Sequence, residues 1–187
     1  MATVACLCLN IMTNHLFILT GPQGSGKTSF IKKLVALLVE ASFPCEGFYA
    51  DGYWENDMRS RFEIVEINGI NRALLCDTHP ETGDIPFRRF FFKQSGLRFG
   101  YKILKQAAGK HSCVFIDETG SLELEGKGWA KALELLCKKP PAILILTVRD
   151  CFVNKIIDCF HLKPERVWHL NDCSPEEVAE ELLCISS

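Results

Sequence analysis

The sequence predicts a single α/β domain built around a mostly parallel β-sheet that is flanked by helices, with an antiparallel hairpin inserted after the first helix. Short continuous apolar runs, typical of buried parallel strands, alternate with segments of helical periodicity. One internal stretch instead alternates polar and apolar residues, as antiparallel strands do. The 187 residues contain no repeat, low-complexity tract or linker, so one domain over residues 1–187 is expected.

The first predicted strand covers residues 15–21 (HLFILTG), an apolar run that ends in glycine. A helix is predicted at residues 27–41, where apolar residues recur at helical spacing: Phe30, Ile31, Leu34, Leu37 and Leu38. Residues 47–76 are rich in β-branched and aromatic residues and contain Asn68-Gly69. An Asn-Gly pair between two such runs is a strong hairpin signal, so the antiparallel insert is placed here.

The second half of the chain continues the alternation of strands and helices. Residues 77–86 are crowded with Pro, Gly and Asp and predict a loop, and residues 87–110 predict a short strand and then a helix. Further strands are expected at residues 112–117, 142–148 and 166–170, and further helices at residues 128–139, 150–160 and 174–184. The last helix begins with Ser174, Pro175 and Glu177, a capping box with proline at the first helical position.

Composition narrows the function classes. The formal net charge is −2, which indicates neither nucleic acid nor a membrane as partner. The ten cysteines are scattered without a CxxC pair or zinc-ligand spacing, so we expect reduced thiols and a cytoplasmic protein. The first residues lack a basic region, and no apolar run reaches membrane-spanning length. Met1 and Met12 are alternative start sites, and residues 1–12 are a possible flexible or wrongly assigned extension.

Residues 21–28 (GPQGSGKT) match the phosphate-binding P-loop pattern G-x-x-x-x-G-K-[ST], also called Walker A. Because a predicted buried strand precedes it and an amphipathic helix follows it, a chance glycine-rich turn is the weaker interpretation. Gly24 and Gly26 allow backbone amides to approach a phosphate closely. Lys27 adds a positive charge for the β- and γ-phosphates, and the hydroxyl of Thr28 suits Mg²⁺.

A pair of acids follows the predicted strand that ends in VFID. Ligands bind at the carboxyl edge of an open parallel sheet, so Asp117 is the candidate for holding Mg²⁺ through water (Walker B). Glu118 is the candidate for orienting or deprotonating a water that attacks phosphorus, and a solvated loop acid is its alternative. Glu123 has three open roles: contact with Mg²⁺-bound water, fixing of the loop, or a plain surface acid.

Basic residues supply further candidates. Arg149 ends the predicted strand 142–148 and is a candidate for stabilising charge on the γ-phosphate, with an ion pair to Asp150 or a solvated position as its alternative. The segment Arg88–Lys110 carries seven basic residues and no acid. A lid over phosphates, a polyanion surface and a solvated helix face are all open for it, so nucleic acid stays a less favoured partner. Three arginines of this segment are the ones to test: Arg88, Arg89 and Arg98. An adjacent aromatic cluster is expected to be core rather than a base-stacking platform: Phe90, Phe91, Phe92 and Phe99.

With both motifs placed, the chain resembles the P-loop nucleoside-triphosphatases of thermophiles and their cancer-related nucleoside-triphosphatase relatives. The matching stretches are GPQGSGKTSFIKKL, GFYADG with RFEIVEING, FIDETGSLELEGKGWAKAL and LTVRD, in the family's order over residues 15–160. The block Asp117–Glu123 and the GFY hairpin are its more specific features, and the LEGKGW version resembles a bacterial branch. Many family members carry a Gly-Lys/Arg-Tyr-type segment where this chain has FRRFFFKQSGLRFGYKIL.

The resemblance implies a RecA-like fold of the class with a catalytic Glu beside the strand-end Asp. It also implies slow Mg²⁺-dependent hydrolysis of nucleoside triphosphates with loose base choice. It supports Thr28 and Asp117 as metal-binding residues and Glu118 as the residue that orients water. Nucleotide contact is then expected from Gly21, Pro22, Gln23, Gly24, Ser25, Gly26, Lys27, Thr28, Phe115, Ile116, Asp117, Glu118, Thr119, Gly120, Ser121 and Leu122.

The primary hypothesis is therefore an enzyme that hydrolyses ATP and other nucleoside 5′-triphosphates to diphosphate and phosphate. Its expected catalytic residues are Glu118, Lys27 and Arg149, and its expected cofactor is Mg²⁺. Two alternatives stay open: a nucleotide or small-molecule kinase with the basic segment as a lid, and a non-catalytic switch controlled by nucleotide state. The protein partner and the base preference are not predicted.

Overall fold

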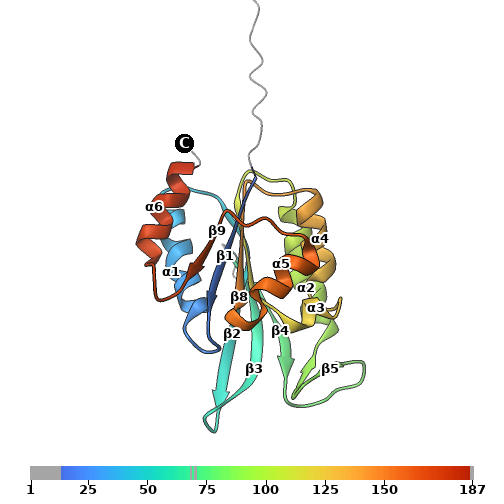
Figure 1. Cartoon of the computed structure of the whole chain (residues 1–187). Helices are drawn as coiled ribbons and strands as arrows, with labels where there is room; N and C mark the ends of the chain where they lie inside the picture. Colours follow the sequence, from blue (N-terminus) through green and yellow to red (C-terminus); the bar gives the residue numbers. More distant parts are fainter. Residues whose placement is uncertain (1–13, 68, 70, 186–187) are drawn as a thin grey trace, which may run out of the picture.

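The structure, a computed structural model, describes residues 14–67, 69 and 71–185. A central β-sheet lies between two layers of helices (Figure 1). The predicted α/β class is confirmed, and the alternative starts Met1 and Met12 lie outside the described residues. Within the described part, no helix is long and apolar enough to cross a membrane.

The helices are α1 (Lys27–Glu40), α2 (Gln94–Ala107), α3 (Ser121–Leu124), α4 (Ala130–Lys138), α5 (Val153–Phe160) and α6 (Pro175–Ile185), with a short 3₁₀ turn, η1 (Asp150–Phe152), before α5. The strands are β1 (His15–Gly21), β2 (Cys45–Glu55), β3 (Met58–Glu66), β4 (Arg72–Asp77), β5 (Ile85–Phe87), β6 (Phe90–Phe92), β7 (Cys113–Thr119), β8 (Ile143–Arg149) and β9 (Arg166–His169). Among the described residues, these strands form one sheet in the order β5-β6-β4-β3-β2-β7-β8-β1-β9.

One half of the sheet is parallel and the other is antiparallel. Strands β2, β7, β8, β1 and β9 pair in parallel, and β8 lies between β1 and β7. Strands β2, β3, β4, β6 and β5 pair antiparallel. The antiparallel part is therefore much larger than the single hairpin that the sequence predicts.

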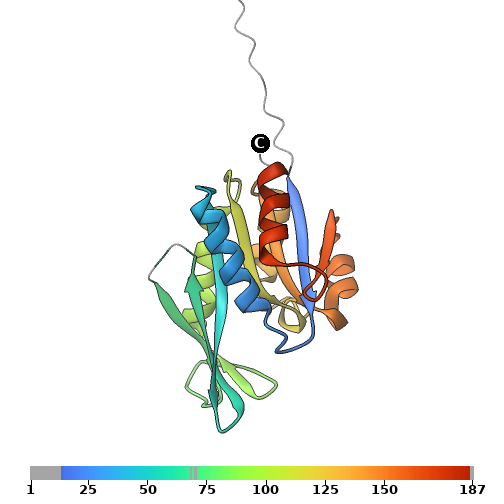
Figure 2. The ribbon, with the colours of Figure 1, turned by 90° about the vertical axis from the view of Figure 1, so that its left-hand side faces the viewer.

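Strand β2 belongs to both halves. Residues Cys45–Phe48 pair with β7, and residues Phe48–Glu55 pair with β3, so Phe48 is paired on both sides. Figure 2 shows the outer part of β2 and its antiparallel neighbours projecting beyond the helices at the bottom of the view. We call the outer half of β2 together with β3, β4, β5 and β6 the antiparallel arm.

The turns of the arm differ in part from the prediction. The chain reverses between β2 and β3 at Asn56 and Asp57, whose φ angles of 48° and 60° are those of a tight hairpin turn. The pair Asn68-Gly69 lies between β3 and β4, which are also antiparallel neighbours, although Asn68 is outside the described residues. The last two residues of the predicted loop at residues 77–86 belong to β5.

Two hydrophobic cores pack the helices against the sheet. Helices α2, α4 and α5 cover one face, and α1 and α6 cover the other (Figure 1). The first core includes Ile18, Phe48, Ile64, Leu104, Ile116, Leu133, Leu146 and Ile156. The second includes Phe17, Leu19, Ile31, Leu34, Leu38, Phe115, Ile145 and Leu182. Adjacent residues of β1, β7 and β8 thus enter opposite cores, which explains the continuous apolar sequences of these three strands.

The remaining elements follow the predicted order. Helix α6 begins with the predicted capping box: Ser174 N donates to Glu177 Oε2 at 2.8 Å, and Glu177 N donates to Ser174 Oγ at 3.2 Å. Helix α3 is an addition, and the helix predicted at residues 150–160 begins as η1. Seven cysteines of the described part are free thiols: Cys76, Cys113, Cys137, Cys151, Cys159, Cys173 and Cys184; Cys6 and Cys8 lie outside the described residues.

Candidate active site at the carboxyl edge of the sheet

Three parallel strands bring the candidate residues to one edge of the sheet. Strand β1 ends at Gly21, which is paired with Arg149 at the end of β8. Strand β7 ends beside β8, with Thr119 paired to Val148. The glycine-rich turn after β1, the two acids of β7 and the arginine of β8 therefore share one edge, as the sequence predicts.

The glycine-rich turn joins β1 to α1. Gly24 and Gly26 have φ angles of 75° and 100°, a backbone region that residues with a Cβ rarely adopt. A Cβ at either position would meet no atom within 4 Å, so the space in front of both glycines is open. Ser25 closes the turn by donating from Oγ to Pro22 O at 2.8 Å. Helix α1 begins at Lys27, so the positive end of its dipole lies at this turn.

Lys27 is folded back over this turn. Its side chain is only 6% exposed, and Nζ donates to Gly21 O at 2.8 Å and to Pro22 O at 2.7 Å. Burial lowers the pKa of Lys27, and the nearby Glu118 carboxylate acts in the opposite direction. A positive charge is thus held at the start of α1, where anionic ligands bind.

A bulge in β7 sets the positions of the two acids. Ile116 is paired with Leu146 and Thr119 with Val148, so Asp117 and Glu118 together oppose the single residue between them on β8. Glu118 is the extra residue of the bulge and has a φ angle of 60°, in the left-handed region. A regular strand would turn these adjacent side chains to opposite faces of the sheet, whereas the bulge re-aims them.

The residue of β8 that faces the bulge is Thr147, which is fully buried. Its hydroxyl donates to Asp117 Oδ1 and accepts from Glu118 N at 2.8 Å. It therefore fixes both acids with one oxygen. The sequence interpretation missed Thr147, although a lone polar residue within the apolar run AILILTV is a visible signal.

Asp117 is 1% exposed and is surrounded by donors. Its Oδ2 accepts from Thr28 Oγ1 at 2.8 Å and from Ala50 N at 3.0 Å. Burial, followed by the neighbouring Glu118, raises the pKa of Asp117, and hydrogen bonds from Thr147, Ala50 and Thr28 oppose that rise. The two predicted metal-binding residues are thus in direct contact, with hard oxygen atoms of the kind that Mg²⁺ prefers.

Glu118 lies next to Asp117 but is more exposed. Arg149 Nη2 donates to Glu118 Oε2 at 3.2 Å, and Nη1 donates to Gln23 Oε1 at 3.0 Å. The guanidinium therefore links the glycine-rich turn to the second acid. The alternative prediction, an ion pair between Arg149 and Asp150, differs from this arrangement. Asp150 instead accepts a hydrogen bond from Thr20 Oγ1 at 2.7 Å.

Glu123 is a structural acid of the loop after β7. It is 2% exposed, and its carboxylate accepts from Gly120 N at 2.7 Å and from Trp129 N at 3.0 Å. Burial raises the pKa of Glu123 to about 7 in spite of these hydrogen bonds. Of its three predicted roles, the geometry fits the fixing of the loop and contradicts the surface acid.

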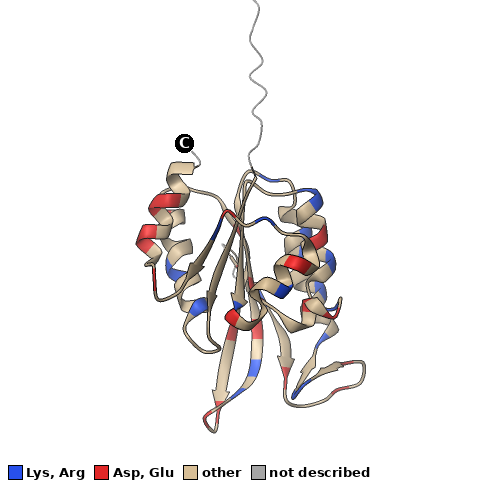
Figure 3. Cartoon of the chain, viewed as in Figure 1, with Lys and Arg blue, Asp and Glu red and all other residues tan. Residues whose placement is uncertain are grey.

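The basic segment Arg88–Lys110 does not form one continuous charged surface. Lys93 is buried, and its Nζ lies 2.8 Å from Asp84 Oδ2 and 3.4 Å from Asp77 Oδ1, so it anchors the loop before β5. Arg98 is exposed on α2. Figure 3 shows residues of both signs on each face of the sheet, although α6 carries only acidic residues and α2 only basic ones. Only the turn between β5 and β6 brings this segment close to the acid pair.

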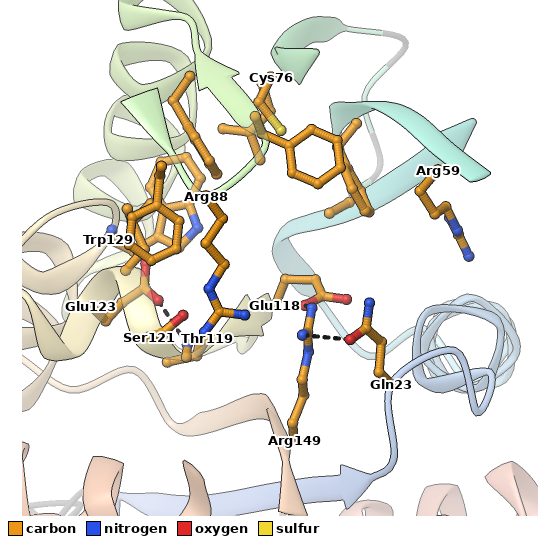
Figure 4. A pocket seen from close by; sticks show the side chains of 18 of the residues that line it. Gln23, Arg59, Cys76, Arg88, Glu118, Thr119, Ser121, Glu123, Trp129 and Arg149 are labelled. Atoms are coloured by element: carbon orange, nitrogen blue, oxygen red, sulfur yellow. Dashed lines mark hydrogen bonds and ion pairs between the residues drawn. The ribbon is translucent and has the colours of Figure 1, made fainter. Parts of the chain in front are cut away.

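That turn contributes to a pocket of about 380 Å³ beside Glu118 (Figure 4). Its wall includes the aromatic residues Phe62, Phe87, Phe90, Phe92, Trp129 and Phe152 and the arginines Arg59, Arg88, Arg89 and Arg149. Phe90 and Phe92 are therefore pocket residues as well as core residues, which departs from the prediction. The pocket joins the antiparallel arm to the end of β7, and no local sequence motif marks it.

Not all of the predicted nucleotide-contact residues lie at the edge of the sheet or on the pocket wall. Asp117 and Glu118 lie at the edge, and Thr119, Gly120, Ser121 and Leu122 line the pocket. The side chains of Phe115 and Ile116 are fully buried in opposite cores and support β7 instead. Among the described residues, no group of three or more His, Cys, Asp or Glu side chains is placed to hold a metal ion.

Comparisons with known proteins support the predicted family. A family model described as NTPase matches residues 16–183. The nucleoside-triphosphatase THEP1 of Thermotoga maritima is 27% identical over 173 residues, which cover 90% of this chain and 93% of the relative. The cancer-related nucleoside-triphosphatase homolog of Mus musculus is 28% identical over 145 residues, which cover 73% and 76% of the two chains.

Two solved structures share the fold. The human cancer-related nucleoside triphosphatase superposes with a TM-score of 0.68 at 21% identity, covering 92% of this chain and 96% of that one. THEP1 of Aquifex aeolicus superposes with a TM-score of 0.65, also at 21% identity, covering 92% and 99%. The likeness in fold therefore extends over nearly the whole chain.

Proposed function

This chain belongs to the NTPase family, and from that premise we propose that it hydrolyses nucleoside 5′-triphosphates, ATP among them, to diphosphate and phosphate with Mg²⁺ as cofactor. One observation carries the proposal: the glycine-rich turn and the two acids meet at one edge of the sheet, joined by Arg149. We expect the enzyme to act in the cytoplasm, with the nucleoside triphosphate as its partner.

The glycine-rich turn binds the triphosphate. The open space in front of Gly24 and Gly26 lets the backbone amides at the start of α1 approach the phosphate oxygens. Lys27 supplies its charge to the β- and γ-phosphates by exchanging the carbonyls of its own loop for phosphate oxygens. The γ-phosphate is thereby directed towards the acid pair.

Thr28 and Asp117 are the residues that would hold Mg²⁺, Thr28 through its hydroxyl and Asp117 through water. The ion neutralises charge on the β- and γ-oxygens when it is bound. Because Ala50 N, Thr28 and Thr147 together fix Asp117, its carboxylate is held in place before any ligand arrives.

Glu118 orients the attacking water and takes its proton. Its own backbone N–H donates to Asp117 Oδ1 at 3.0 Å, which keeps the two acids of the bulge close together. Arg149 keeps the Glu118 carboxylate in position through Oε2 and turns towards the γ-phosphate as negative charge develops there.

Measurement of phosphate release tests this function directly. Release from ATP, GTP, CTP and UTP would be followed with and without Mg²⁺ and without any added acceptor. We expect release from ATP with Mg²⁺ and a loss of at least about tenfold when the ion is chelated. Turnover that requires an added acceptor would establish the kinase alternative instead, and tight nucleotide binding without turnover would establish the switch.

A further inference from the structure

The pocket beside Glu118 begins where the triphosphate site ends. Of the residues in the glycine-rich turn, Gln23 lines it, whereas the residues from Gly24 to Thr28 are absent from its wall. Glu118 and Arg149 form the boundary between the two sites. About 380 Å³ of space therefore lies next to the expected position of the γ-phosphate, and the proposed hydrolysis uses only enough of it for a water molecule.

The wall of the pocket suits a planar apolar ring. Five of its six aromatic side chains are only half-buried: Phe62, Phe87, Phe90, Phe92 and Phe152. They come from the arm on one side and from η1 on the other. Phe62 packs edge-on against Phe90, and Phe87 packs edge-on against Phe92, so the rings brace one another. Half-buried rings that line a cavity leave aromatic surface for a ligand to cover.

The charge of the pocket favours an anion. Four arginines and two glutamates line it, and the carboxylate of Glu123 is already committed to the backbone of its own loop. Arg149 pairs with Glu118, and Arg89 donates to Arg59 O at 2.8 Å. A positive excess thus remains at the turn between β5 and β6.

Arg88 is one of three pocket arginines, with Arg59 and Arg89, that have no acidic partner among the described residues. Among the described residues it makes no hydrogen bond or ion pair, and its guanidinium lies 5.7 Å from the centre of the Phe87 ring. Its φ angle of 54° is unusual for a residue with a Cβ and sets the turn that carries it. In Figure 4, Arg88 extends into the pocket towards Thr119 and Ser121, with Glu118 nearby.

From these contacts we propose that the pocket binds a second ligand of the nucleoside monophosphate class, with its base against the aromatic wall and its phosphate on Arg88. The ligand binds together with the nucleoside triphosphate rather than in its place. This site goes beyond the proposed hydrolysis, because its occupation requires neither Mg²⁺ nor turnover.

The base of the triphosphate substrate does not fill this pocket. In a P-loop the backbone amides hold the α- and β-phosphates, and the lysine reaches the β- and γ-phosphates. The γ-phosphate end of the substrate therefore faces Glu118 and the pocket, and its base lies at the opposite end of the phosphate chain. A second molecule is needed to cover the aromatic wall.

Binding in the presence of a saturated triphosphate site tests the proposal. AMP, GMP, CMP and UMP would each be titrated calorimetrically into the full chain with excess Mg²⁺ and a β,γ-imido triphosphate analogue. We expect one site for at least one monophosphate, with the neutral nucleoside and inorganic phosphate each at least about tenfold weaker. Absence of binding by all four monophosphates, or their displacement by the analogue, would overturn the proposal.

Variants locate the site. Arg88→Gln keeps a side chain at the positive φ angle and is expected to lower monophosphate affinity at least about tenfold, and Phe87→Ala is expected to lower it similarly. Arg98→Gln, on the exposed face of α2 outside the pocket, is the matched control and should bind as the wild type does. An equal loss in the control, or no loss in the first two, contradicts the assignment.

Lys27→Ala separates this proposal from the proposed hydrolysis. The variant should lose triphosphate binding and phosphate release but retain monophosphate binding, because Lys27 does not line the pocket. Loss of monophosphate binding in a folded Lys27→Ala protein would place the monophosphate in the glycine-rich turn and refute the second site. Circular dichroism and thermal melting of each variant establish that it is folded.

Discussion

Arg149 and Glu118 are joined across the ends of β8 and β7, with Nη2 3.2 Å from Oε2. The same guanidinium reaches Gln23 in the glycine-rich turn. Strand β8, which lies between the strands of the two motifs, thus supplies the side chain that connects them.

Glu118→Gln should keep triphosphate binding and remove most phosphate release. The amide has nearly the shape of the carboxylate but cannot accept a proton, so we expect a fall in turnover of about 10²- to 10⁴-fold. Steady-state phosphate release and equilibrium binding of a β,γ-imido analogue measure the two effects separately. Glu125→Gln, an exposed acid paired with Lys127, is the control and should retain full activity. Unchanged turnover in Glu118→Gln would defeat the role assigned to this residue.

Two buried threonines of the same edge should respond oppositely to replacement by valine. Thr147 bonds both acids of the bulge, so Thr147→Val removes two hydrogen bonds, one of them to the buried carboxylate of Asp117, and should cost about 1.5–3 kcal/mol of unfolding free energy. Thr119 Oγ1 is buried without a hydrogen-bond partner in the described structure, so Thr119→Val should be neutral or stabilising by up to about 1 kcal/mol. Urea denaturation of both variants compares them, and equal losses would contradict the hydrogen-bond assignments.

The raised pKa of Glu123 predicts a dependence of stability on pH. The folded protein binds this proton more tightly than the unfolded chain, whose ordinary glutamate pKa is 4.5. Between pH 4.5 and about 7 the native state therefore holds more protons than the unfolded state, and stability falls as pH rises through that window.

This contribution has a slope of at most about 1.4 kcal/mol per pH unit. Glu123→Gln does not titrate, so denaturation curves collected across the window should have a smaller slope in the variant than in the wild type. Glu125→Gln again serves as the exposed control and should leave the slope unchanged. A variant slope that equals that of the wild type would show that other groups account for the pH dependence.

Gly47 should not tolerate a side chain. It lies on β2 opposite Phe115 with a φ angle of 101°, and a Cβ there would be 2.1 Å from Phe115 O. Gly47→Ala should therefore separate β2 from β7 and cost more than about 4 kcal/mol of unfolding free energy. Gly109→Ala also has a positive φ angle but meets no atom within 4 Å, so it should cost only about 1 kcal/mol. Similar losses in the two proteins would refute the steric explanation.

Much of the edge could be predicted because its signals are local. The pattern of residues 21–28 is enough to predict a phosphate-binding turn. The run VFID likewise predicts a buried strand with Asp117 at its end. The hairpin signal at Asn68-Gly69 was also local, but the tighter turn at Asn56 and Asp57 has no glycine and was missed. Asn and Asp adopt positive φ angles more readily than other residues with a Cβ, so this turn forms without glycine. The Asn-Asp pair alone is therefore a weak sequence signal for a hairpin.

The remaining features depend on contacts between distant segments. The bulge at Asp117 and Glu118 is visible only when β7 is paired with β8. The pocket needs the arm to fold back so that Phe87 and Phe90 approach the loop after β7. The sequence shows the segment Arg88–Lys110 only as a run of basic residues without acids. In the structure, Lys93 forms ion pairs with Asp77 and Asp84 of the preceding loop. Such pairings have no periodicity or motif of their own.

Strand β2 has a mechanical consequence for the enzyme. It leaves β7 after Phe48, and two residues later Ala50 N–H holds Asp117 Oδ2. Asp117, the proposed metal-binding residue, is thus hydrogen-bonded to the strand from which the antiparallel arm, with Phe87 and Arg88, extends. A displacement of β2 at this point would therefore move the Asp117 carboxylate, which couples the position of the arm to the edge of the sheet where the two acids lie.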